Sequence, residues 1–172
     1  MKEERGFTLI ELVVVVSIVM LLLAWGVPSY STWKMKHDIE TQMAQLYSDL
    51  QYTRMYAYGN KVVTGVYWGT GTSFTSYQIK YDASSPLNNS IDDTADVQIG
   101  ATVRPKYAIT SSASQNSVSF DGRGFLNLPS ADNANPVTFS VSSTFGAGIN
   151  CVSVSSTRVI LGVMNAGSCA PK

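Results

Sequence analysis

An unbroken apolar segment near the N-terminus constrains the fold of this chain more than any other feature. Residues 7–27 read FTLIELVVVVSIVMLLLAWGV, and Glu11 is the only charged side chain among them. As a helix, these 21 residues would extend about 31 Å, which matches a hydrocarbon core of roughly 30 Å. Trp25, Tyr30 and Trp33 gather at its far end, as aromatic rings do at a lipid–water interface. A small domain cannot cover such a helix, so lipid or copies of the same helix must do so.

A second helical segment follows a helix-breaking residue. Pro28 lacks a backbone N–H and its ring clashes with the preceding turn, so we expect a kink there. Through residues 29–59, apolar side chains recur at spacings of three and four, which predicts an amphipathic helix that ends near Gly59. The apolar stripe consists of Ile39, Met43, Leu46, Tyr47 and Leu50. The polar residues expected to face elsewhere are Asp38, Glu40, Gln42 and Asp49.

The remainder of the chain, residues 60–172, has the composition of a β-rich domain. It is rich in Ser, Thr, Gly, Val and Asn in short alternating runs, which predicts half-buried antiparallel strands. The dipeptide Asp121-Gly122 predicts a hairpin turn, and residues 84–93 and 130–136 are expected to be loops. The expected strands are residues 61–68, 76–82, 95–103, 117–120, 124–128, 136–142, 149–155 and 157–163. The fold class is therefore α+β, with a long N-terminal helix packed on a C-terminal antiparallel sheet.

The charged and polar residues give little support to catalysis, and we expect no catalytic residue, cofactor or metal. With 12 basic and 12 acidic residues, the net charge is zero, so no global basic field attracts nucleic acid or anionic lipid. The one histidine, His37, stands beside Asp38 and has no Ser or Cys partner identifiable by spacing, which favours a solvated helix face. A solvated turn is also favoured over a calcium site for Asp92, Asp93 and Asp96, which lack the ordered spacing of a calcium loop.

The two cysteines, Cys151 and Cys169, lie close together near the C-terminus. Two cysteines and one histidine cannot complete a four-ligand structural zinc site. If the domain is exported into an oxidising space, a disulfide is the natural interpretation, and two independent buried thiols are the alternative. Closing a loop of about 17 residues would stabilise the domain by roughly 3 kcal/mol.

The residues at the start of the apolar segment resemble a known signature. The run GFTLIEL, residues 6–12, resembles the N-terminus of type IV prepilins and type II secretion pseudopilins. The resemblance implies that a prepilin peptidase cuts between Gly6 and Phe7 and methylates Phe7, and that Glu11 guides assembly. Pro28 matches the helix-breaking proline common in that family. The leader departs from the family pattern because its charges cancel, whereas the family usually carries net positive charge there.

The resemblance also implies an organisation and a location. Residues 1–6 would be the leader, 7–28 the transmembrane and filament-core helix, 29–59 the amphipathic helix and 60–172 the pilin domain. The chain would be a structural subunit, a minor pilin or pseudopilin, of a type IV pilus or a type II secretion pseudopilus. Its partners would be other such subunits, the prepilin peptidase, the inner-membrane assembly platform and, before assembly, membrane lipid. It would cross the inner membrane once with its domain in the periplasm, and then enter the filament at the cell surface.

Glu11 has two interpretations. A carboxylate at mid-bilayer costs about 2.5–3.5 kcal/mol, which points to a functional partner. In the family, cleavage exposes an α-amino group on Phe7, and pairing such a cation with Glu11 in an apolar core would fix the axial position of the helix. Alternatively, Glu11 lies near the membrane edge and reaches the headgroups. A secretory signal peptide cut after Gly26 is disfavoured because its apolar core would be too long and would contain Glu11.

Two further stretches suggest a subfamily, and one known activity of that subfamily gives a competing function. Residues 46–57 and 118–124 resemble the helix end and the hairpin of GspH/FimT-type minor pilins. Arg54, in the first stretch, either closes the helix C-terminus or is a solvated surface side chain. Some minor pilins of this type bind DNA in natural transformation through basic residues near the C-terminus. Only Arg158 and Lys172 stand there, so we do not expect DNA binding and keep a DNA-binding minor pilin as the alternative function. A membrane-tethered enzyme lacks a catalytic constellation.

Overall fold

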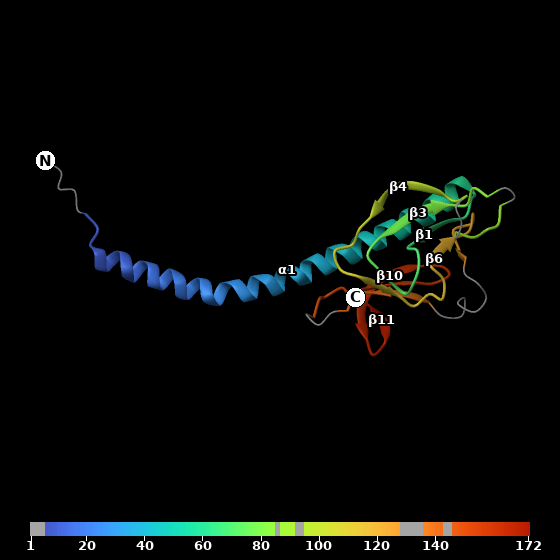
Figure 1. Ribbon diagram of the computed structural model, residues 1–172. Coiled ribbons are helices and arrows are strands. Elements are labelled where there is room, and N and C mark those ends of the chain that lie inside the picture. The colour runs from blue at the N-terminus through green and yellow to red at the C-terminus, as the bar shows by residue number, and fades with distance from the viewer. Residues whose placement is uncertain (1–5, 85–86, 92–94, 128–135, 143–145) are drawn as a thin grey trace.

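A long helix and a β-rich domain make up the structure, a computed structural model that describes residues 6–84, 87–91, 95–127, 136–142 and 146–172. Helix α1 spans Leu9–Asn60; its first part extends away from the domain, and its second part packs on it (Figure 1). The strands are β1 Thr64–Tyr67, β2 Ser73–Phe74, β3 Tyr77–Tyr81, β4 Val97–Val103, β5 Ile109–Ser111, β6 Ser117–Phe120, β7 Leu126–Asn127, β8 Val137–Ser140, β9 Cys151–Val154, β10 Val159–Asn165 and β11 Ser168–Pro171.

Within these residues, the strands form two antiparallel sheets. The first sheet has the order β4-β3-β1-β6-β7 and the second the order β11-β10-β9-β8-β5-β2. Helix α1 contacts β1, β3 and β6 of the first sheet and β9 and β10 of the second. One helix therefore covers parts of both sheets and holds them together, which confirms the α+β class.

The apolar stripe of α1 forms the centre of the core, as the sequence predicts. Ile39, Met43, Leu46 and Leu50 are each at most 1% exposed. Tyr47, which is partly buried, packs against the same core. The sheets supply an aromatic cluster on the other side. Its members are Trp68, Phe74, Tyr77 and Phe139, with ring centroids 5.0–6.3 Å apart in the contacting pairs. Burial of these large side chains is the dominant stabilising term of the domain.

The C-terminal end of α1 is capped and covered by a turn of the first sheet. The helix continues to Asn60, and Lys61 adopts the left-handed conformation with φ 57°. The turn between β6 and β7 packs on this end, because a Cβ atom at Gly122 would lie 2.9 Å from the backbone carbonyl carbon of Lys61. The hairpin predicted from Asp121-Gly122 is confirmed, since β6 and β7 pair antiparallel on either side of it.

The strand predictions agree with the structure in part. Each of the eight expected strands overlaps a described one, but the sequence analysis missed β2, β5 and β11. Strands β2 and β5 have two and three residues, too few to alternate, and they lack a hairpin signal such as the Asp121-Gly122 dipeptide before β7. Strand β11 contains Pro171, which is compatible only with an edge strand. The expected loop at residues 130–136 lies outside the described residues apart from Pro136. Residues 1–5 of the leader and Asp92 and Asp93 also lie outside them.

The first part of α1 runs from Leu9 past Pro28 without interruption. The axis of α1 changes direction between the protruding part and the part on the domain (Figure 1). Side chains of residues 24–29 are not among those described, so the kink at Pro28 stays a prediction. Among the described residues, no helix has the length and apolarity needed to cross a membrane.

Candidate assembly interface

The residues of the expected cleavage site precede the helix. Gly6 and Phe7 are exposed and non-helical, and the Phe7 side chain is 79% exposed. Thr8 is the N-cap in an extended conformation, and its hydroxyl accepts a hydrogen bond from the backbone N–H of Glu11 at 3.4 Å. The Glu11 carboxylate lies in the first turn, where the helix dipole favours a negative charge. The bond between Gly6 and Phe7 is therefore open to solvent, one turn ahead of Glu11.

The protruding part of α1 presents a continuous apolar surface. The large hydrophobic side chains between Leu9 and Leu23 are 43–81% exposed. Folded monomers rarely expose apolar patches beyond a few hundred Å², and larger ones mark interaction surfaces. Ser17 adds no unsatisfied polar group, because its hydroxyl donates to the carbonyl of Val13 at 2.8 Å. This surface is suited to lipid tails or to other apolar helices.

Where α1 enters the domain, polar side chains bind it to the segment between β4 and β5. Gln42 forms two hydrogen bonds with the backbone of Tyr107: its amide donates to the carbonyl at 2.8 Å, and its oxygen accepts from the N–H at 2.9 Å. Asp38 forms an ion pair with Lys106. The hydrogen bond between them lowers the pKa of Asp38 and raises the pKa of Lys106, so both stay charged at neutral pH.

Two more carboxylates of α1 also reach the domain. Glu40 accepts a hydrogen bond from the backbone N–H of Gly148 at 2.7 Å. Asp49 accepts one from the buried hydroxyl of Tyr77 at 2.6 Å. Burial, followed by this bond to Asp49, raises the pKa of Tyr77, so the phenol remains a donor. The expectation that these polar residues face elsewhere is wrong: they flank the apolar stripe and fix the helix to the sheets at both of its borders.

Arg54 joins three elements near the end of the helix. Its Nε donates to the carbonyl of Gly124 at 2.7 Å, and one terminal nitrogen donates to the carbonyl of Thr157 at 2.7 Å. Gly124 lies in the turn between β6 and β7, and Thr157 lies in the turn between β9 and β10. The structural alternative for Arg54 is therefore the one observed, and the residue connects the helix to one turn of each sheet.

We expect Arg54→Met to lower the free energy of unfolding by about 2 kcal/mol, since hydrogen bonds from a charged group contribute about 1.5–3 kcal/mol. The matched control is Arg123→Met in the same turn. The Arg123 side chain is 81% exposed; it pairs with Asp121 and lies 5.8 Å from the centroid of the exposed Phe125 ring, so the change should be about 1 kcal/mol or less. Chemical denaturation of the full chain in detergent measures both. Equal effects of the two substitutions would contradict this role of Arg54.

The predicted disulfide is present. Cys151 of β9 and Cys169 of β11 are bonded, with their Cα atoms 5.9 Å apart. Strand β10 pairs with both β9 and β11, so the bond crosses the strand between them. It ties the last strand of the chain to a buried strand of the second sheet.

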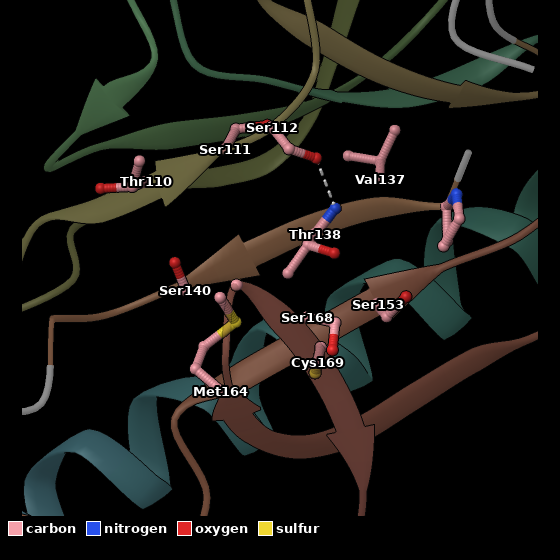
Figure 2. Close-up of a pocket in the computed structure, with 12 residues that line it drawn as sticks. Thr110, Ser111, Ser112, Val137, Thr138, Ser140, Ser153, Met164, Ser168 and Cys169 are labelled. Atoms are coloured by element: carbon pink, nitrogen blue, oxygen red, sulfur yellow. Dashed lines mark hydrogen bonds between the residues drawn. The ribbon is translucent and has the colours of Figure 1, made fainter. Parts of the chain in front are cut away.

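A groove of about 470 Å³ lies on the second sheet beside the disulfide (Figure 2). Met164 of β10 and Cys169 of β11 line one side of the groove. Most of the other lining side chains carry a hydroxyl group: Thr110, Ser111, Ser112, Thr138, Ser140, Ser153 and Ser168. Ser112 accepts a hydrogen bond from the backbone N–H of Thr138 at 2.8 Å. The described lining residues include no ionisable side chain, so they offer neither a general base nor a set of metal ligands.

The remaining candidate residues are scattered. His37 is stacked on Trp33 with ring centroids 5.7 Å apart, on the exposed side of the helix. Asp96 is buried, with 7% of its surface exposed, so the expectation of a solvated turn is wrong for this residue. Among the residues that the structure describes, no three His, Cys, Asp or Glu side chains gather as a metal site would require.

The two basic residues near the C-terminus lie at different ends of the domain. The Lys172 ammonium group is beside Gly148 and Glu40, since a Cβ atom on Gly148 would lie 2.7 Å from it. Arg158 follows Thr157, which binds Arg54. Residues 40 and 54 are separated by about 21 Å along the helix, so these cations do not form one phosphate-binding patch.

Two family matches cover most of the chain. Residues 1–27 match the prokaryotic N-terminal methylation motif, and residues 42–158 match the type II transport protein GspH. The chain is also similar to prepilin peptidase-dependent protein D of Escherichia coli, with 27% identity over 146 residues, which are 80% of this chain and 81% of that protein.

Solved structures with a similar fold include the type IV minor pilin FimU of Pseudomonas aeruginosa in two crystal forms. One superposes with a TM-score of 0.54 at 13% identity, covering 80% of this chain and 96% of FimU. The other has a TM-score of 0.51 at 12% identity, covering 76% and 96%. At this identity, the likeness shows the fold alone. The GspH match extends over more than half of the sequence, and the chain therefore belongs to the type II transport protein GspH family, as a pilin-like subunit with an N-terminal methylation motif.

Proposed function

We propose that this chain is a minor pilin or pseudopilin that is cut between Gly6 and Phe7, methylated on Phe7, held in the inner membrane by residues 7–28 and then added to a filament. The observation that carries the proposal is the apolar surface of α1 between Leu9 and Leu23, which the domain does not cover. In the membrane, lipid tails cover it, with the β-rich domain on the periplasmic side. In the filament, the same helices of neighbouring subunits cover it, so one surface serves both states.

Glu11 supplies the alignment that an apolar surface lacks. Apolar helices slide past one another at little cost, because their contacts are non-directional. Cleavage leaves an α-amino group on Phe7, and this cation on one subunit pairs with the Glu11 carboxylate of its own helix or a neighbouring one. Because a buried carboxylate without a partner is costly, only registers that pair it are favourable. The prepilin peptidase, the assembly platform and other pilin subunits are the partners that this sequence of steps requires.

The cleavage step gives a direct test. When the chain is produced together with a prepilin peptidase, membrane-purified protein is expected to begin with N-methyl-Phe7, because Gly6 and Phe7 are exposed and non-helical. Intact-mass and N-terminal analysis measure this. The control is the same chain produced without the peptidase, which should keep Met1. A mature chain that begins at Val27, or one that keeps Met1 beside an active peptidase, would overturn the proposed processing.

A further inference from the structure

Positive charge gathers at one end of the domain although the whole chain is neutral. Lys34 and Lys36 lie on α1 just before it enters the domain, and Arg104 and Lys106 follow β4. The ion pair of Lys106 with Asp38 holds this segment against the helix. We call these four cations the basic collar; Lys34, Arg104 and Lys106 are exposed, and Lys36 is partly exposed.

The carboxylates near the basic collar do not cancel it. Asp38 is paired with Lys106, and Glu40 accepts a hydrogen bond from Gly148 on another side of the helix. The four collar cations and these two carboxylates together carry a charge of +2, on a chain whose side chains total zero, and the Lys172 ammonium group beside Glu40 adds a further cation. The basic collar therefore produces a local positive potential, even though the net charge of the chain is zero.

Two exposed aromatic residues lie between the basic collar and the apolar segment. The side chains of Tyr30 and Trp33 are 62% and 59% exposed, and their ring centroids are 6.0 Å apart. They have no role in the core of the domain. Aromatic rings of this kind are typical of the headgroup level of a membrane, which places the collar on its aqueous side.

Helix geometry gives the height of each cation above the hydrocarbon. From the end of the apolar segment at Val27, Lys34 is about 10 Å along the axis and Lys36 about 14 Å. The headgroup layer takes up about 5–7 Å of this distance, and the screening length at physiological salt is about 8 Å. The two lysines thus lie within one screening length of the lipid phosphates. Arg104 and Lys106, which adjoin Asp38 at about 16 Å, contribute less.

We propose that the basic collar binds anionic lipid headgroups before the subunit enters a filament, an inference that rests on the membrane anchoring proposed above. The aromatic residues set the depth of the helix, and the cations hold the near end of the domain against the membrane. Anionic lipid would orient the domain, and extraction into a filament would release these contacts. An acidic surface on another protein would suit the same cations, but it would not explain the exposed aromatic residues beside them.

The test is lysine footprinting of the full chain in bilayer discs of phosphatidylcholine, with or without anionic phosphatidylglycerol. Mass spectrometry measures the rate of acetylation at each lysine. Lys34 and Lys36 are expected to react about fivefold more slowly in the anionic discs, because this factor corresponds to the usual attraction energy of one lysine near an anionic membrane surface. Lys61 and Lys80, on the rest of the domain, should react equally in both. At about 1 M salt, where the screening length falls to about 3 Å, the difference should vanish.

A variant pair sharpens the test. Lys34→Gln should weaken the lipid-dependent protection of Lys36, and the control Lys61→Gln should leave it unchanged. Equal reactivity of Lys34 and Lys36 in the two lipids would overturn the inference, as would protection that persists at high salt or that extends to Lys80. A chain that fails to remain in discs of either composition would instead overturn the proposed anchoring, and the inference with it.

Discussion

A Glu11→Val chain is expected to insert and to be cleaved like the wild type, yet to be nearly absent from sheared filaments. Valine is more compatible with lipid than glutamate, and Gly6 and Phe7 are untouched, so export and processing should persist. What disappears is the carboxylate that we propose pairs with an α-amino group in the filament core. Losing one partner of a buried ion pair costs about 3–5 kcal/mol, which is a factor of at least about 100 for each subunit that joins.

The control for this result is Ser17→Val in the same segment. It also replaces a polar side chain with valine, but Ser17 is uncharged and its hydroxyl donates to the Val13 carbonyl of its own helix, so the substitution removes no charge from the segment. Ser17→Val should assemble normally. Both variants are measured in a strain without the wild-type gene, by the amounts in sheared filaments and in membranes, and by filament number if the subunit stands only at a tip. Normal assembly of Glu11→Val would mean that Glu11 contacts headgroups and does not direct assembly.

The helix could be predicted from the sequence because its determinants are local. The spacing of Ile39, Met43, Leu46 and Leu50 identifies a buried face, and these four side chains are indeed the centre of the core. The motif GFTLIEL is equally local and leads directly to Gly6, Phe7 and Glu11. A single chain does not display the neighbouring helices, so their roles in assembly remain predictions.

The polar contacts of the helix could not be predicted in the same way. Asp49 bonds to Tyr77, and Gln42 bonds to Tyr107, 65 residues further along the chain. Hydrophobic periodicity identifies the side of the helix that is buried but not the partners of the polar residues at its borders. Arg54 shows the same limit, since its two carbonyl partners come from turns of different sheets. The division into two sheets likewise depends on non-local pairing that includes strands too short to show alternation.

Gly162→Ala is expected to destabilise the domain by about 3 kcal/mol and to leave a large share of chains with free thiols. Gly162 is buried in β10, paired with Cys151 on one side and Pro171 on the other, where the disulfide crosses over. A Cβ atom there would collide with the carbonyl oxygen of Ala170 and lie 3.1 Å from the sulfur of Cys169. The backbone of β11 would have to move away, which pulls Cys169 from Cys151. Loss of a native disulfide from a small domain typically costs about 2–5 kcal/mol.

The matched control, Gly59→Ala, should instead raise the free energy of unfolding. A Cβ atom at Gly59 meets nothing within 4 Å, and the residue lies in α1, where alanine is favoured over glycine by up to about 1 kcal/mol. Chemical denaturation of the full chain in detergent gives the stabilities, and thiol labelling under denaturing, non-reducing conditions gives the free cysteines. If Gly162→Ala kept wild-type stability with no free thiol, β11 could shift without cost. The bond between Cys151 and Cys169 would then form equally well with a side chain at residue 162. The passage of the disulfide over β10 would therefore not be the reason for a glycine at this position.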